Sequence, residues 1–180
     1  GPGLIFNYNL ESYIPAIMQN IADAQHENGM IPTIAPEYVV FGGDFTDSPE
    51  WGVAGVILPW MYYHYYGDDS LLKEYYPVMK KYVDYLTTRA DNGIVSYGLG
   101  DWYDYGEHAA GYSKNSPIAL SATSHYYFGI DLLAKAAKLL NKTDDSIFYE
   151  NLAKSVKNTF NGKFFDEKTK QYGTASQFSN

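Results

Sequence analysis

The chain has 180 residues, 46% of them hydrophobic, and a net charge of −8 at pH 7. This apolar content supports a folded core, of one domain or of part of a larger one, and argues against disorder. With 21 acidic residues, 13 basic ones and no cysteine, the composition excludes disulfides and thiolate metal sites, and it argues against nucleic-acid and anionic-membrane partners.

Five segments have the three-and-four spacing of apolar residues that predicts amphipathic helices. Glycines predict where three of them end: Gly29, Gly67 and Gly162. Prolines inside two segments, Pro59 and Pro77, predict a kink or a division of the helix. In chain order, the predicted helices span about 10–24, 52–66, 70–91, 116–140 and 144–160.

The spacing also predicts which helix faces are buried. For the second helix, this face comprises Val53, Val56, Ile57, Trp60 and Met61. For the third helix, this face comprises Leu71, Leu72, Tyr75, Val78, Met79, Tyr82, Val83 and Leu86. For the fifth helix, it comprises Ile147, Phe148, Leu152, Val156 and Phe160.

The lengths of the connections indicate the fold class. Short joints at 67–69 and 141–144 predict antiparallel neighbouring helices. Long loops at 30–50 and 94–116 separate the other helices, and 164–173 is expected to be an extended or hairpin connection. The pattern predicts an all-α protein of stacked αα-hairpins.

Aromatic residues are unusually abundant. They make up 17% of the chain, with 19 tyrosines and 3 tryptophans. Tyr and Trp combine a flat apolar face with a hydrogen-bonding edge. Such surfaces suit sugars, although a helical core rich in tyrosine explains the same composition.

The first candidate site lies in residues 44–52 and combines Asp44, Asp47 and Glu50 with Trp51. Carboxylates can accept hydroxyl protons or transfer a proton, and an indole face can stack on a sugar ring. The alternative is an ordinary helix start, capped by residue 47 or 48 and opened by proline, with Glu50 near the positive end of the helix dipole.

The second candidate site lies in residues 98–108, where Asp101 and Trp102 follow Gly98 and Gly100. Glycines let the backbone approach a ligand closely. Stacking by Trp102 and hydroxyl contacts from Asp101 form one interpretation, and an ordinary turn forms the other. The four histidines lack metal-ligand spacing, so no metal site is predicted.

Several motifs resemble the catalytic domain of bacterial α-L-rhamnosidases. Their order along the chain carries the resemblance more than any single motif does. The motifs are Ile31 to Tyr38, Asp47 to Gly52, Leu58-Pro59-Trp60, Tyr76 to Leu86, Gly100-Asp101-Trp102 and Ser116-Pro117 with Ala122-Thr123.

The resemblance implies a six-hairpin (α/α)6 toroid whose long loops form the active-site funnel. It implies an inverting glycosidase that removes terminal α-L-rhamnose from glycans or glycosides without a cofactor. Trp51 and Trp102 match aromatic residues of the rhamnose pocket, and Asp101 matches the acidic neighbour of the second one. Asp47 and Glu50 are further candidates for sugar binding and the only candidates for catalysis within the chain.

The family's general acid and base are glutamates that the resemblance places before Gly1 and after Asn180. Residues 1–180 are therefore expected to be a fragment of one catalytic domain, with the rest of that domain as its partner. Apolar helix faces left open by the fragment are expected to be exposed or to cause self-association.

Two alternatives remain at this point: a non-catalytic helical segment that binds carbohydrate, and another six-hairpin glycosidase. The first residues lack the plan of a signal peptide, so any export signal is expected outside the chain. The compartment stays open between periplasmic, secreted and cytoplasmic, and the sequence leaves open whether residues 1–3 are native.

Overall fold

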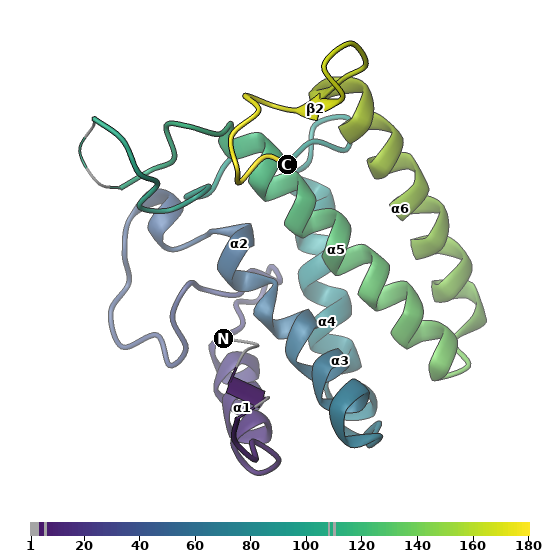
Figure 1. Ribbon diagram of the computed structural model, residues 1–180. Coiled ribbons are helices and arrows are strands. Elements are labelled where there is room, and N and C mark those ends of the chain that lie inside the picture. Colours follow the sequence, from purple (N-terminus) through teal and green to yellow (C-terminus); the bar gives the residue numbers. More distant parts are fainter. Residues whose placement is uncertain (1–3, 6, 108, 110) are drawn as a thin grey trace.

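The structure, a computed structural model, describes residues 4–5, 7–107, 109 and 111–180 and confirms the all-α class (Figure 1). Two sequence-based questions concern residues outside the described part of the chain: whether residues 1–3 are native, and the role of His108 at the end of the second candidate site. The helices are α1 (Tyr13–Ala24), the 3-10 turn η2 (Gly43–Phe45), α2 (Pro49–Gly52), α3 (Ala54–Tyr66), α4 (Ser70–Arg89), α5 (Ile118–Leu139) and α6 (Thr143–Phe164).

Two antiparallel helical hairpins form the body of the structure, α3 with α4 and α5 with α6, and α4 packs against α5 (Figure 1). Gly67, with φ of +71°, lets the chain reverse after α3. The predicted connection after α6 is a hairpin in which β1 (Phe165–Asp166) pairs antiparallel with β2 (Gln171–Tyr172). Short joints thus produce stacked αα-hairpins, as predicted.

The centre of the core is the buried face of α4. Its predicted apolar stripe is confirmed, with Leu72, Met79, Val83 and Leu86 fully buried. Gly129 of α5 lies against this face, where a Cβ would make ordinary van der Waals contacts, 3.4 Å from Val53 Cγ2 and 3.7 Å from Val83 Cγ2.

The two internal prolines do not break their helices. The predicted helix 52–66 is divided at Val53 into α2 and α3, while Pro59 stays inside α3 and is buried. Pro77 stays inside an uninterrupted α4 on its exposed side, where water can replace the lost backbone donor. Each proline removes one backbone hydrogen bond from its helix. Burial of the Pro59 ring offsets this loss in α3, and hydration of the free carbonyl group offsets it near Pro77 in α4.

One predicted helix end was wrong by several residues, and one predicted stop signal lies in a turn beyond a helix end that was predicted correctly. The helix α1 ends at Ala24, and Gly29, with φ of +101°, closes the following turn instead. The helix α6 continues past Gly162 to Phe164. The ring of Phe164 lies 5.0 Å from that of Phe160, so aromatic packing extends the helix beyond the glycine.

The predicted core face of α6 was also partly wrong. Ile147 and Phe148 are exposed at 56% and 57%, whereas Tyr149 and Ala153 are buried beside Val156. The face is rotated because Tyr149 combines a large apolar ring with a hydroxyl that finds polar partners on α4. That the fragment leaves apolar helix faces open stays a prediction.

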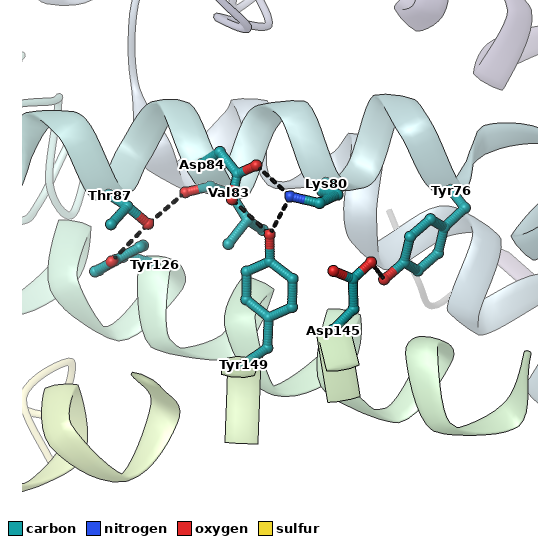
Figure 2. A network of polar contacts seen from close by, with 8 residues as sticks. All are labelled: Tyr76, Lys80, Val83, Asp84, Thr87, Tyr126, Asp145 and Tyr149. Carbon is teal, nitrogen blue, oxygen red and sulfur yellow. Dashed lines mark hydrogen bonds and ion pairs between the residues drawn. The ribbon is translucent and has the colours of Figure 1, made fainter. Parts of the chain in front are cut away.

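A polar network joins α4 to α6 beneath this face (Figure 2). The hydroxyl of Tyr149 donates to Asp84 Oδ1 at 2.5 Å and accepts from Lys80 Nζ at 2.9 Å. Lys80 also donates to Asp84 Oδ2 at 2.7 Å, and Tyr76 donates to Asp145 Oδ2 at 2.8 Å. Burial, followed by the bond to Asp84, raises the pKa of the Tyr149 hydroxyl, so this group stays neutral at physiological pH.

We expect Tyr149→Phe to lower the free energy of unfolding by about 1 kcal/mol, because two half-exposed partners, Lys80 and Asp84, keep only each other and water. The lower stability of Tyr149→Phe should be seen at neutral pH, where the wild-type phenol is protonated. The stability that this hydroxyl contributes to the wild type is lost only as pH rises through its raised pKa. Denaturant unfolding measures it. Tyr105→Phe, at a position 96% exposed, is the control, and equal stability of the two variants would contradict the expectation.

A groove of about 350 Å³ separates the N-terminal segment and α1 from α3. Three residues of the predicted core face of the second helix, Val53, Ile57 and Met61, line this groove, and the buried face of α3 consists of Gly55, Val56, Pro59 and Tyr62. Self-association through such apolar surfaces stays a prediction. None of the helices within the described residues is both long and apolar enough to span a membrane.

Candidate functional site

The two predicted clusters lie against each other in the structure. The backbone N–H of Leu99 donates to Ser48 Oγ at 3.3 Å, and that of Gly100 donates to Glu50 Oε1 at 3.2 Å. Ser48 Oγ in turn donates to Glu50 Oε2 at 2.6 Å. The start of α2 therefore holds the loop that carries Asp101 and Trp102.

This connection depends on glycine. Gly98 has φ of +122°, and a Cβ at this position would lie 2.6 Å from Glu50 Oε2. Gly100 has φ of +69°, and its Cβ would lie 2.6 Å from the Cβ of Ser113. Both residues need the left-handed conformation and the space that only glycine provides. The close backbone approach that the structure has is between protein segments, and the approach to a ligand stays a prediction.

Trp102 is half-buried among other aromatic rings. Its ring lies 4.8 Å from Phe45 at 88°, 5.0 Å from Tyr103 and 5.7 Å from Tyr112. Edge-to-face contacts of this kind fix the indole and leave part of its surface open. Trp51 is 37% exposed, so neither tryptophan is sealed in the core.

Asp101 is partly buried beside Trp102. Partial burial, followed by repulsion from Asp104, raises the pKa of its carboxyl. Asp104 itself is committed to the loop, because its Oδ2 accepts from the backbone N–H groups of Lys114 and Asn115 at 2.7 and 2.6 Å. Of the two carboxylates, Asp101 is the one whose side chain no described hydrogen bond holds.

Asp47 faces α4 rather than Trp51. Its Oδ2 accepts from the hydroxyl of Tyr85 at 2.5 Å, and its Oδ1 is buried without a hydrogen-bond partner among the described residues. Burial raises the pKa of this carboxyl, and Tyr85, Arg89 and Tyr97 oppose the rise. The arrangement suits a group that holds the loop in place.

Among the described residues, neither Asp47 nor Ser48 makes the capping hydrogen bond that the alternative interpretation predicted. The N-cap of α2 is Ser48, but its side chain makes no capping bond, because its Oγ serves Glu50 and Leu99 instead. Pro49 does open the helix, as that alternative predicted. The cluster is thus a helix start whose polar side chains join the second loop.

The histidines that the structure describes have partners other than a metal-ligand cluster. Within residues 4–5, 7–107, 109 and 111–180, no three histidine or carboxylate side chains gather in a way that could hold a metal ion. His26 pairs with Glu37 at 2.9 Å, and His125 Nδ1 lies 2.9 Å from the carbonyl oxygen of Ser121.

The profile of the bacterial alpha-L-rhamnosidase six-hairpin glycosidase domain matches residues 1–180. The chain belongs to this family. The resemblance drawn from the loop motifs and the helical-hairpin fold that it implied are therefore confirmed.

The curated relatives that match this chain include several α-L-rhamnosidases. One from Formosa agariphila is 29% identical over 180 residues, which cover 99% of this chain and 19% of the relative. The structure of the enzyme from Dictyoglumus thermophilum is 36% identical with a TM-score of 0.84, covering 93% of this chain and 18% of that one. The enzyme from Streptomyces avermitilis, solved in complex with L-rhamnose, is 26% identical with a TM-score of 0.70, covering 83% and 14%.

The chain spans about a fifth of the length of the curated relatives that it matches. Sequence reasoning did not find Tyr85, Arg89 or Tyr97 as neighbours of the rhamnosidase-like loops. One signal was available: Tyr85 and Arg89 are four residues apart near the end of α4, so they share a helix face directly before the second loop.

Proposed function

We propose that this chain is part of an α-L-rhamnosidase and contributes one wall of the pocket for the terminal sugar. Residues 1–180 then form a portion of a single (α/α)6 catalytic domain, and the remaining helices of that domain are the chain's partner. The observation that carries the proposal is the direct joining of two loops, each with a partly exposed tryptophan. The rhamnose complex of the Streptomyces avermitilis relative supports the choice of sugar.

Within this pocket, Trp51 and Trp102 offer apolar faces to the C–H patches of the sugar, and Asp101 accepts a hydrogen bond from a hydroxyl group. The raised pKa of Asp101 brings its protonation closer to neutral pH than that of an exposed aspartate. Sugar binding is therefore expected to weaken as pH falls, because protonation replaces a charged acceptor with a weaker neutral one.

Hydrolysis with inversion needs a general acid on the leaving oxygen and a general base on water at the opposite face. In the structure, Asp47 and Glu50 are both bound to the protein, to Tyr85 and to Ser48 with Gly100. This geometry favours an acid and a base from other parts of the domain, with the present chain providing binding and orientation.

Release of the aryl group from an aryl α-L-rhamnoside by the full-length protein tests the proposal. We expect activity on this substrate, with the β-anomer as the first product by NMR, and none from residues 1–180 alone. The matched controls are an aryl α-D-mannoside, an aryl β-D-glucoside and an unsaturated glucuronide. Preference for one of these would replace the rhamnosidase with another six-hairpin glycosidase, and inactivity on all of them would favour a carbohydrate-binding segment.

A further inference from the structure

We propose that Asp47 is a positioning residue, which sets the relative placement of the two tryptophan-bearing loops through a polar cluster on α4. This proposal rests on the proposed function only for its kinetic readout. We call the four side chains Asp47, Tyr85, Arg89 and Tyr97 the loop anchor.

The loop anchor connects three segments. Asp47 belongs to the first loop, Tyr85 and Arg89 to the last turns of α4, and Tyr97 to the second loop. The hydroxyl of Tyr85 donates to Asp47 Oδ2 at 2.5 Å, and the Arg89 guanidinium lies 4.7 Å from the centre of the Tyr97 ring. The C-terminal end of α4 therefore contacts both loops, one through a hydrogen bond to a carboxylate and the other through a cation–π contact.

The loop residues in these two contacts, Asp47 and Tyr97, each lie a few residues from a tryptophan in the sequence. Asp47 precedes Ser48, which binds the backbone of Leu99, and Tyr97 precedes Leu99 on the other loop. The loop anchor and the Ser48 contact thus form two successive links between the loops, and both links lie close to Trp51 and Trp102. A shift at Asp47 would be passed directly to these two rings.

The burial of Asp47 argues against direct contact with a sugar. Its Oδ1 is inaccessible to solvent, and so are the hydroxyls of Tyr97 and Tyr82. Tyr85 and Tyr97 both oppose the rise in the pKa of Asp47, so this carboxyl is directed toward protein groups and not toward solvent.

The negative charge of Asp47 can be tested separately from its shape. Asparagine keeps an oxygen for the hydroxyl of Tyr85 but removes the attraction to Arg89. Because burial raises the pKa of Asp47, falling pH neutralises the wild-type carboxyl early and makes it resemble asparagine. The titratable or charged groups around this carboxyl are Tyr82, Tyr85 and Arg89 of α4, Tyr97 of the second loop, and Asp44 and Glu50 nearby in the chain.

We expect Asp47→Asn in the full-length protein to raise KM for an aryl α-L-rhamnoside about tenfold at neutral pH and to change kcat less than about twofold. The ratio of KM in Asp47→Asn to KM in the wild type should decrease as pH falls, because the wild-type carboxyl becomes neutral. Titrating groups that both proteins share cancel in this ratio. Tyr85→Phe should raise KM as well. Tyr126→Phe is the matched control, because its hydroxyl donates to Thr87 Oγ1 on the same turns of α4, at 2.9 Å, and not to a loop residue.

A second measurement does not need the enzyme activity. In a Trp60→Phe background, excited at wavelengths that tyrosine does not absorb, only Trp51 and Trp102 of this chain fluoresce. If the surrounding domain contributes tryptophans, wild type and variant are compared by difference. We expect Asp47→Asn and Tyr85→Phe to increase acrylamide quenching, and Tyr126→Phe to leave it unchanged. If the wild type hydrolyses no rhamnoside, the proposed function fails while this measurement still decides the positioning role.

Three results would overturn the positioning role. One is unchanged KM and unchanged quenching in both Asp47→Asn and Tyr85→Phe. Another is a loss of kcat of a thousandfold or more at constant KM, which would identify Asp47 as a catalytic residue. The third is an equal response of Tyr126→Phe, which would assign the effect to general loosening of α4.

Discussion

Replacing Trp102 with alanine in the full-length protein is expected to lower kcat/KM for an α-L-rhamnoside by about 5- to 150-fold. The indole is fixed by edge-to-face contacts with Phe45, Tyr103 and Tyr112 and keeps part of its surface open. Losing a desolvated aromatic face against a sugar removes about 1–3 kcal/mol of binding. Steady-state kinetics measure the loss, which should fall mainly on KM if the ring binds substrate and transition state alike.

Tyr112→Ala separates sugar binding from loop packing. This change removes a ring that supports Trp102 at 5.7 Å but leaves the indole in place. If Trp102 binds the sugar, its removal should be clearly more harmful than that of Tyr112. Equal effects of the two substitutions would show that the indole only packs the loop, and unchanged kinetics in Trp102→Ala would remove it from the pocket.

The helical periodicity of the sequence was sufficient for the architecture because each helix packs one apolar face. Periodicity gave a wrong prediction where one side chain has both an apolar and a polar part, or where its backbone and side-chain preferences disagree. Tyr149 has a ring for the core and a hydroxyl for Lys80 and Asp84, so the buried face of α6 rotated away from Ile147 and Phe148. Pro59 carries an unfavourable backbone signal, yet its ring is buried within α3.

The site was predictable as two clusters but not as one arrangement. The residue types of the loops indicated aromatic and acidic chemistry, and the structure joins these loops through Ser48 and Glu50. The partner of Asp47 lies 38 residues away in the chain, and local spacing contains no information about such a contact. Asp47 and Glu50 looked like free acids in the sequence because their partners come from other segments.

The same long-range packing makes Gly52 a sensitive position. A Cβ at Gly52 would lie 2.3 Å from the hydroxyl oxygen of Tyr82 and 2.7 Å from its Cζ. Tyr82 is fully buried and stacks on Tyr85 with ring centres 6.4 Å apart, so its ring has little room to move. We expect Gly52→Ala to lower the free energy of unfolding by about 1–3 kcal/mol, measured by thermal or denaturant unfolding.

Gly162→Ala is the control for this prediction, because Gly162 also lies in a helix but a Cβ there would meet no atom within 4 Å. Alanine is the better helix former by about 0.5–1 kcal/mol, so this variant should be slightly more stable than the wild type. Adding Tyr82→Phe to Gly52→Ala removes the closest clashing atom, and should restore part of the stability. Because Tyr82 stacks on Tyr85, Gly52→Ala should also raise KM. A Gly52→Ala variant as stable as the wild type would contradict the tight packing of α2 on α4.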